Sequence, residues 1–352
     1  MAKEHNIKVP AHPSIYQSSN REITVYFCEP EQGINKDTGL LLLIPNFGDT
    51  AASDISTQMR SSFADTYNMV TVQCEYFGQE FMGVSSSPQF NFDTQALQGI
   101  ITPEEFDRVY KGNRIDVNEL LQVGVNYSLN IVGIEQFNET LENFNDMGIM
   151  QALDHLSALQ VVAEILKDNE YVIHAGKVMV YGTGHGAYLA YLCNAFAPKL
   201  FSLLIDYSGW LFPSYLETDR SLTYRSGKTT MTIVFQYLAK RTPFDKELLH
   251  LSSLYKHINN SCNIFSFHNS NDPITTSRHK QALCQSIKNC MYSELTEADP
   301  IAFFNYVMQN VKVPFQTSNE LNLPLNIINT KKYRYTFDYS GGVPVLTRQE
   351  KK

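Results

Sequence analysis

The stretch KVMVYGTGHGAYLA, residues 177–190, decides the fold. Its first part, residues 177–181, is an apolar run of the kind that forms a buried strand, and residues 187–197 have a helical pattern that Pro198 closes. Between them lies a glycine-rich turn, GTGHG at 182–186. The stretch therefore predicts a strand, a sharp turn and a helix in immediate succession.

The rest of the chain repeats this alternation of strand and helix. Further strands are predicted at 21–28, 40–44, 69–75, 201–207, 263–268 and 291–295, and helices at 54–67, 139–167 and 277–288. Such alternation is typical of an α/β fold with a mostly parallel central sheet and helices on both faces. We predict a single domain over residues 1–352.

Three segments lie outside this alternation. The stretches at about 84–136 and about 211–260 are predicted to be insertions that form a lid or cap, and the second has helical patterns at 233–240 and 247–258. A C-terminal extension covers residues 311–352 or so. Within it, a hairpin is expected at 333–345 around Gly341 and Gly342.

Composition and charge exclude some classes of partner. The 352 residues carry a formal net charge of −8 without a basic stripe, so nucleic acid is not expected as a partner. No apolar run approaches the ~20 residues of a membrane span, and we expect a cytoplasmic protein without membrane contact. The six cysteines are scattered without a metal-ligand spacing. Core thiols are therefore favoured over disulfides, and neither a metal nor a cofactor is expected.

The glycine-rich turn matches the nucleophile elbow of serine hydrolases except at its centre. In G-x-S-x-G, a strand-to-helix turn presents the serine hydroxyl, whereas this chain has Gly184 at that place, flanked by Gly182 and Gly186. Glycine has no side chain with which to attack a carbonyl, so nucleophilic catalysis at this position is impossible. A dinucleotide-binding loop is the less favoured interpretation, because the three-residue step of G-x-G-x-x-G is missing.

Four stretches resemble the bacterial α/β-hydrolase-like family known as domain of unknown function 2920. They are MGIMQALDHLSAL at 147–159, YGTGHGAYL at 181–189, LIDYSG at 204–209 and HNSND at 268–272. The resemblance implies an α/β-hydrolase fold from about residue 20 to about residue 310. It also implies a triad of an elbow serine, an acid after the strand that follows the second insertion, and a late histidine.

The resemblance places these three roles on Gly184, Asp272 and Gln309. Asp272 is the candidate acid, and its place after a strand and before a helix suits that role. Gln309 is the nearest counterpart of the histidine, and no histidine follows His279 in the chain. Because histidine must remove the proton of the nucleophile, two of the three roles are empty.

Residues around the elbow are the remaining candidates. Phe47 and His185 could donate backbone amides to an oxyanion, with Asn46 beside them. His185 is also a candidate catalytic side chain, although a histidine at this place more often positions the turn. Gly182 and Gly186 are expected to border the pocket.

The favoured hypothesis is a degenerate hydrolase, a pseudoenzyme that lacks the nucleophile serine and the late histidine. It would bind a ligand or a partner as an accessory protein. From the resemblance, we expect the ligand to be a small acyl or glycan-like molecule and the partner to be an active paralogue. The alternative is an active carboxylic-ester or deacylating hydrolase with a relocated nucleophile. An engineered loss of the serine ranks last, because it would not also remove the histidine.

Overall fold

The chain forms two compact units. The computed structural model describes residues 2–83, 90–91, 94–112, 114–135, 137–296, 299–315, 318 and 320–351. The core unit comprises Met1–Gln79, Asp146–Pro213 and Phe244–Lys352, and the second unit comprises Glu80–Asn145 and Ser214–Pro243.

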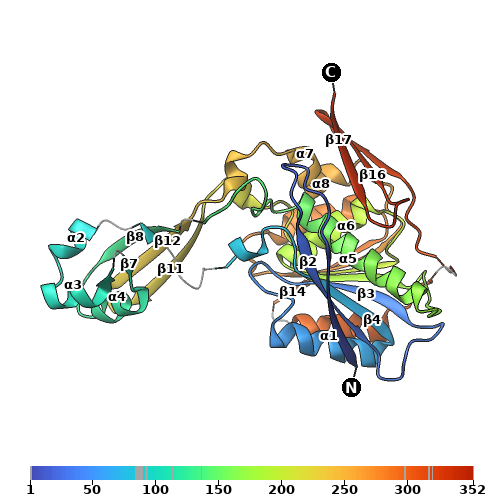
Figure 1. Cartoon of the computed structure of the whole chain (residues 1–352), viewed down its shortest axis with the longest axis horizontal. Helices are drawn as coiled ribbons and strands as arrows, with labels where there is room; N and C mark the ends of the chain where they lie inside the picture. Colours follow the sequence, from blue (N-terminus) through green and yellow to red (C-terminus); the bar gives the residue numbers. More distant parts are fainter. Residues whose placement is uncertain are drawn as a thin grey trace. The chain divides into compact units, whose positions relative to one another are not determined.

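The core unit is built on an eight-stranded sheet (Figure 1). In spatial order its strands are β1 (Lys3–Pro10), β2 (Glu22–Glu29), β4 (Met69–Cys74), β3 (Gly39–Ile44), β9 (Val178–Thr183), β10 (Leu203–Tyr207), β13 (Asn263–Asn269) and β14 (Cys290–Leu295). The β1–β2 and β2–β4 pairs are antiparallel, and every pair from β4 to β14 is parallel. This is the strand order of the α/β-hydrolase fold, which confirms the predicted fold class.

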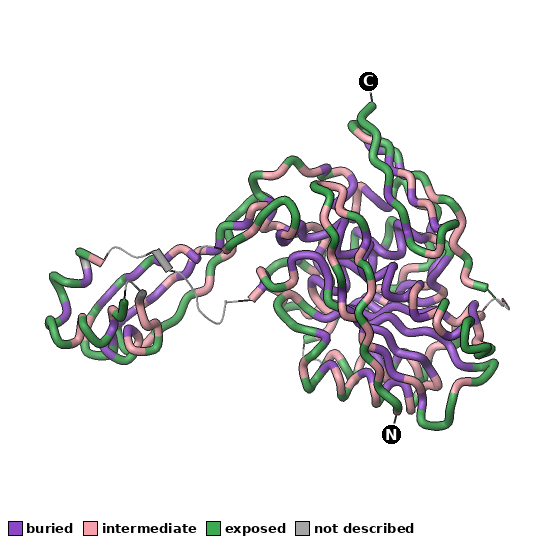
Figure 2. The backbone as a smooth tube through the Cα atoms, in the orientation of Figure 1, coloured by how far each residue is buried: buried purple, intermediate pink, exposed green. Residues whose placement is uncertain are grey.

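Helices cover both faces of this sheet. On one face lie α1 (Asp54–Tyr67) and α10 (Pro300–Asn310), where the rings of Phe63 and Phe304 stack with centroids 4.1 Å apart. On the other lie α5 (Ile149–Asp168), α6 (His185–Phe196) and α9 (Ser277–Ser286). Strands β3, β4 and β10 are buried along their whole length, and Figure 2 shows this interior in purple. Burial on both faces explains their continuous apolar sequences.

Most predicted strands and helices of the core unit are confirmed within a few residues, but one predicted helix begins later, and strand β1 and helix α10 were not predicted. The helix predicted at 139–167 begins only at Ile149, because Met147 has a φ of 55° and the Asp146 carboxylate accepts from the N–H groups of Gly148 and Met150. Strand β1 is absent from the predicted set, because its residues at the sheet edge are half-exposed and largely polar.

Two composition-based expectations can be compared with the structure. All six cysteines are free and five of them are buried, which confirms core thiols. Within the described part of the chain, α5 is the one helix that is long and apolar enough to cross a bilayer, and 83% of that stretch is buried.

The second unit contains a four-stranded sheet and three short helices. The sheet has the order β11 (Arg220–Ser226), β12 (Thr229–Phe235), β8 (Asn130–Glu135) and β5 (Phe90–Asn91). The other elements are α2 (Thr94–Gln98), α3 (Pro103–Val109), α4 (Val117–Gly124) and the hairpin β6–β7 (Tyr110–Lys111 and Arg114–Ile115). Short 3₁₀ turns occur at Gln79–Phe81, Ser214–Leu216 and Leu238–Arg241.

We predicted one domain with two insertions, and parts of both insertions form this second unit. The two segments are joined because β12 pairs with β8. The helix predicted at 233–240 begins instead as strand β12, whose residues alternate between buried and half-buried because one face of the sheet is covered. Residues 84–89, 92–93, 113 and 136 of the first insertion lie outside the described residues.

The end of the second predicted insertion belongs to the core unit. Its predicted helix at 247–258 is two four-residue helices, α7 (Lys246–Leu249) and α8 (Leu251–Leu254). They are separate because His250 between them has extended backbone dihedrals, with φ −88° and ψ 110°.

The C-terminal extension forms a small antiparallel sheet of β15 (Asn326–Asn329), β16 (Tyr333–Asp338) and β17 (Val345–Glu350). The predicted hairpin around Gly341 and Gly342 is confirmed as the β16–β17 pair. Phe337 stacks on Phe196 of α6 at 4.5 Å, and the Asn326 amide donates to the Phe196 carbonyl at 2.8 Å. These contacts anchor the extension to α6.

Candidate functional site

The turn between β9 and α6 has a strained backbone centred on Gly184. This residue has φ +54° and ψ −117°, a combination that side chains disfavour and glycine tolerates. Its N–H donates to the Tyr207 carbonyl at 2.9 Å, and its carbonyl accepts from the N–H groups of Tyr188 and Trp210 at 3.2 and 3.3 Å. The turn therefore has the sharp geometry of an elbow without a nucleophile at its centre.

Gly182 and Gly186 allow α6 to approach the sheet closely. A Cβ atom on Gly182 would lie 2.5 Å from the Ala187 nitrogen, and one on Gly186 would lie 2.2 Å from the Ile44 carbonyl oxygen. Both distances are shorter than any real contact. The two glycines thus act through packing, and neither lines the cavity described below.

Asn46, in the loop after β3, occupies the space in front of Gly184. Its Oδ1 accepts the N–H of His185 at 3.2 Å, the amide that was predicted to stabilise an oxyanion. A Cβ atom on Gly184 would lie 2.1 Å from this oxygen. The side-chain carbonyl of Asn46 therefore accepts the hydrogen bond that the carbonyl oxygen of a substrate would need.

The His185 side chain is a buried, uncharged member of an aromatic cluster. Its ring lies 5.0 Å from Trp210, 5.4 Å from Phe47 and 5.8 Å from Tyr188, between centroids. Burial lowers the pKa of His185 to about 3, and the Met147 backbone opposes this shift in part. A base with so low a pKa is poorly matched to proton transfer near neutral pH. The geometry thus favours the positioning role of His185.

Asp272 lies in the turn after β13, at the same sheet edge as the elbow. Its Oδ1 accepts the N–H groups of Ile274 at 2.8 Å and Thr275 at 2.7 Å. The buried ring of His268, close in sequence, contacts the Thr275 carbonyl through Nε2 at 2.8 Å. The carboxylate therefore follows β13, and its contacts with Ile274 and Thr275 stabilise its own turn.

Gln309 lies far from the elbow, which corrects its assignment as the counterpart of the histidine. It is exposed in the last turn of α10, where its side chain interacts with Tyr67 at the end of α1. Tyr67 precedes β4 and so marks the amino ends of the parallel strands. Helix α10 begins at Pro300, beside Asn46 at the carboxyl ends of the strands. Gln309 lies nine residues further on, about 13 Å along the helix towards the opposite edge of the sheet.

A cavity of about 220 Å³ lies beside the elbow, on the face covered by α1 and α10. Its lining consists of Leu43, Ile44, Pro45, Asn46, Asp49, Ser53, Ile55, Ser56, Met59, Tyr181, Thr183, Asp299, Pro300 and Ile301. Sequence reasoning missed Asp49 and Asp299. Thr183 was considered from the sequence as a hydroxyl that could replace the nucleophile, and alternation along β9 places it on the same face as Tyr181.

A buried ion pair supports the turn behind the elbow. The Lys280 ammonium lies 2.6 Å from the Asp206 carboxylate, and both side chains are fully buried. Lys280 donates to the Gly209 carbonyl at 2.8 Å, and Asp206 accepts the Gly209 N–H at 2.7 Å. Tyr191 and Ser266 also donate to Asp206. The network fixes the backbone that leads into Trp210.

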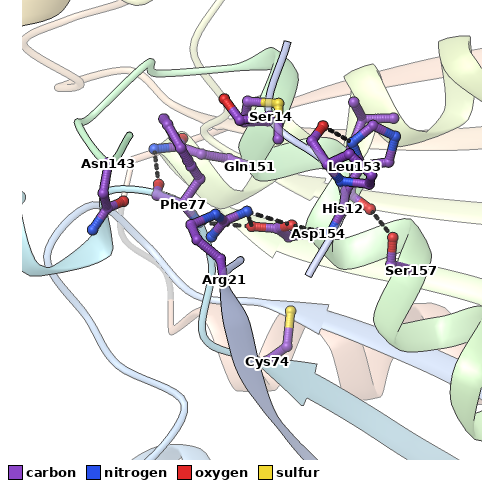
Figure 3. Close-up of polar contacts among 12 residues, drawn as sticks. His12, Ser14, Arg21, Cys74, Phe77, Asn143, Gln151, Leu153, Asp154 and Ser157 are labelled. Carbon is purple, nitrogen blue, oxygen red and sulfur yellow. Dashed lines mark hydrogen bonds and ion pairs between the residues drawn. The ribbon is translucent and has the colours of Figure 1, made fainter. Parts of the chain in front are cut away.

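A second buried carboxylate ties α5 to the amino-terminal strands (Figure 3). Asp154 accepts hydrogen bonds from the Arg21 guanidinium at 2.8 Å and from the N–H groups of Phe77 and His12 at 2.9 and 3.2 Å. Burial raises the pKa of Asp154 to about 6, and Arg21 opposes that rise. These contacts are structural, because they hold chain segments and leave the carboxylate enclosed.

One buried thiol contacts an imidazole. The Cys74 sulfur lies 3.0 Å from Nδ1 of His155. Burial raises the pKa of the Cys74 thiol and lowers the pKa of His155 to about 3. A buried neutral thiol is not a nucleophile. Within the described ranges, no group of three or more His, Cys, Asp or Glu side chains is arranged to hold a metal ion.

Comparison with solved structures finds similar chains at low sequence identity. Est1E from Butyrivibrio proteoclasticus with bound ferulic acid is 11% identical, covers 84% of this chain and 96% of its own, and has a TM-score of 0.46. Esterase 2 of Thermogutta terrifontis, phosphonylated by sarin, is 12% identical, with coverages of 86% and 96% and a TM-score of 0.44. An alpha-beta serine hydrolase homologue from Coxiella burnetii is 12% identical, with coverages of 88% and 97% and a TM-score of 0.41.

Sequence comparison identifies the family. No curated protein matches the chain. The family described as Protein of unknown function (DUF2920) matches residues 29–298, well over half of the sequence. The match includes the elbow, Asn46 and Asp272. The chain, with its α/β-hydrolase fold, therefore belongs to the DUF2920 family.

Proposed function

We propose that this protein is a non-catalytic member of the α/β-hydrolase fold that binds a small ligand. One observation carries the proposal: Gly184 stands at the nucleophile position, and the side-chain oxygen of Asn46 accepts the neighbouring His185 N–H at 3.2 Å. The elbow thus lacks the attacking atom, and the donor for an oxyanion is already used. The fold supplies the frame of a hydrolase without the reacting groups.

The hydroxyls near the elbow give little support to a relocated nucleophile. Ser208 is buried, and its Oγ accepts the Asn269 N–H at 2.9 Å. Thr183 faces the cavity, whose lining contains no histidine. Without a histidine to remove its proton, a hydroxyl of ordinary pKa is a weak nucleophile. The alternative of an active ester or deacylating hydrolase therefore ranks second.

Partner and location form part of the same proposal. The ligand would be a small molecule, for which acyl and glycan-like compounds are the family-based expectation. An active paralogue is the candidate protein partner, and the cytoplasm is the proposed location.

The test is hydrolysis of p-nitrophenyl acetate by the full-length protein. We expect the wild-type rate to equal that of heat-denatured protein. The Asn46→Ala/Gly184→Ser variant, which restores the hydroxyl but adds no histidine, should show no burst of p-nitrophenol either. Saturable wild-type turnover that Thr183→Ala or Asp272→Asn abolishes would overturn the proposal in favour of a relocated nucleophile.

A further inference from the structure

A second cavity, of about 540 Å³, lies in the core unit between α5 and the C-terminal extension. One wall is a single face of α5, because Gln160, Ala163, Glu164 and Lys167 recur every three or four residues. The other walls are the loop after α5 and parts of the extension. The volume falls within the roughly 300–1,000 Å³ that is typical of small-molecule sites.

This cavity lies at the opposite end of the parallel strands from the elbow. Helix α5 ends at Asp168, and the lining loop at 171–175 leads from it to the start of β9. The elbow follows the other end of β9. Among the described residues, none lines both this cavity and the one beside the elbow. The two cavities are therefore separate sites.

Gln160 is the lining residue that points to a ligand. Its side chain faces the cavity, yet the residue is only 6% exposed. Its Oε1 is buried and accepts no hydrogen bond from the described part of the chain. An unpaired buried acceptor is costly, and native proteins usually provide it with a partner. A ligand that donates a hydrogen bond would supply this partner.

The chemistry of the side chain narrows the kind of ligand. An amide carries a donor and an acceptor side by side. It pairs best with an edge that has the complementary arrangement, as glutamine does with the donor and acceptor of adenine. The Gln160 amide therefore favours a ligand with an amide-type edge over one that has acceptors alone.

Apolar side chains form much of the remaining wall. Tyr171 and Val172 are 42% and 66% exposed, although both are large and apolar and adjacent in sequence. Leu321 and Leu323 of the extension are half-buried and line the same cavity. Neighbouring apolar surfaces of this kind mark binding sites more often than free surface. A planar ring would cover them.

The charges of the lining disfavour an anion. The Lys167 ammonium lies 3.7 Å from the Glu164 carboxylate, so its charge is already paired. Glu320 adds a further negative charge. Both members of the ion pair are at least half exposed, and water screens their attraction for any ligand. A neutral ligand thus fits the lining better than a carboxylate or a phosphate.

The hydroxyls of the lining add neutral polar contacts. The Tyr339 hydroxyl donates to the Phe196 carbonyl at 2.8 Å, so its proton is committed within the protein. The exposed hydroxyls of Tyr171 and Ser340 can either donate or accept. They are therefore compatible with a neutral ligand and do not select its charge.

We propose that this cavity binds a small neutral molecule with a planar ring and an amide-type edge, in which a donor and an acceptor lie side by side. The edge pairs with Gln160, and the ring packs beside Tyr171. A volume of 540 Å³ equals that of about 18 water molecules at ~30 Å³ each, which leaves room for a substituent beyond one ring. The proposal goes beyond the proposed function, because this site does not depend on the missing nucleophile.

The test compares three ligands that share a pyridine ring and a carbonyl group. Nicotinamide has the amide edge, 3-acetylpyridine replaces its NH₂ with a methyl group of similar size, and nicotinate is an anion. Each is titrated into the full-length protein by ligand-observed NMR. We expect nicotinamide to bind at least about fivefold more tightly than 3-acetylpyridine, the scale of one buried hydrogen bond, and nicotinate to bind most weakly. Equal binding of amide and ketone, tightest binding of nicotinate, or no binding of any would overturn the proposal.

Variants connect the preference to this cavity. Gln160→Leu, which keeps the size but removes the amide, should abolish the preference for nicotinamide over 3-acetylpyridine. Gln285→Leu, at an exposed position of α9, should keep it. Ala163→Trp should weaken the binding of both neutral ligands by filling the cavity. A preference that persists in Gln160→Leu would contradict the site.

Stability separates ligand recognition from a structural role of Gln160. Because its Oε1 has no partner to lose, Gln160→Leu should unfold in urea at the same or a higher concentration than wild type. A clear loss of stability would show that the amide supports the fold, and would contradict its role in binding. Ester hydrolysis is measured separately, so failure here and failure of the proposed function are distinguishable.

Discussion

Gly184 and Asn46 lie next to each other, and each limits which side chain the other position can hold. The elbow conformation at Gly184 needs a residue that tolerates φ +54°, and the Asn46 side chain needs a neighbour without a Cβ. The loss of the serine was visible in the sequence as G-x-G-x-G. The role of Asn46 was not, because it depends on a contact across 139 residues with the His185 N–H.

Restoring the serine should destabilise the protein. Gly184→Ser forces a side chain into a left-handed conformation and against Asn46 Oδ1, and we expect a loss of about 1–3 kcal/mol in the free energy of unfolding in urea. Gly33→Ser is the matched control, since Gly33 also has a positive φ of +80° but open space around it. It should lose less than Gly184→Ser.

A double-mutant cycle separates the two causes. If Asn46 causes the steric part, Asn46→Ala should recover some of the stability lost in Gly184→Ser but none of that lost in Gly33→Ser. A Gly184→Ser variant as stable as wild type, with or without Asn46, would mean that the two side chains do not compete for the same space.

At the level of elements, the turn after β10 depends on α9 through the Asp206–Lys280 pair. Lys280→Met leaves a buried carboxylate without its cation, so we expect a loss of about 3–5 kcal/mol in the free energy of unfolding. The single tryptophan, Trp210, follows Gly209 directly, and its fluorescence in the native state should change as well.

Lys167→Met on α5 is the control for this substitution. Lys167 is exposed and pairs with Glu164 at 3.7 Å one turn away, so its removal should cost far less and leave the Trp210 spectrum unchanged. Equal losses in the two variants would show that the buried pair does not support the turn.

The sequence predicted core elements better than those of the second unit. Continuous apolar runs such as β3 reveal a strand buried on both faces. In β12, alternating residues were mistaken for part of a helix, and the parallel pairing with β8 joins segments about 100 residues apart. Long-range pairing of this kind has no local signal, so the sequence did not show which strands of the two insertions pair with each other.

At the scale of the whole molecule, buried histidines should make stability depend on pH. Burial lowers the pKa of both His155 and His185 to about 3, whereas an unfolded histidine titrates near 6.5. The unfolded state therefore binds more protons below pH 6.5, and stability falls as pH decreases. Asp146 and Asp154, with pKa values raised to about 6, act in the opposite direction as pH falls below 6.

A single substitution isolates one of these contributions. From pH 7.5 to pH 5, His155 should cost about 2 kcal/mol, because 1.5 pH units at ~1.36 kcal/mol each separate pH 5 from 6.5. We expect His155→Gln to reduce the difference between urea unfolding free energies at the two pH values by that amount. His279→Gln, at an exposed position, should leave the difference unchanged.

The mostly parallel sheet and the place of Asp272 between a strand and a helix were predicted from the sequence, but the candidate histidine counterpart was misplaced. The sequence analysis predicted no helix around Gln309, and only the direction of α10 shows that this residue lies at the wrong edge of the sheet. The cavity beside the elbow was unforeseen for the same reason. Asp49, Thr183 and Asp299 come from three distant segments that meet only at the carboxyl ends of the strands.

The absence of a nucleophile is tested most directly by a fluorophosphonate probe, which bonds covalently to activated serine and threonine hydroxyls. The intact mass of the wild-type protein is measured after incubation, beside an active serine hydrolase of the same fold as a positive control. We predict no mass increase for the protein under conditions that label the control fully. A stoichiometric adduct, mapped by peptide analysis to Thr183, Ser208 or another hydroxyl, would contradict the account and identify the relocated nucleophile.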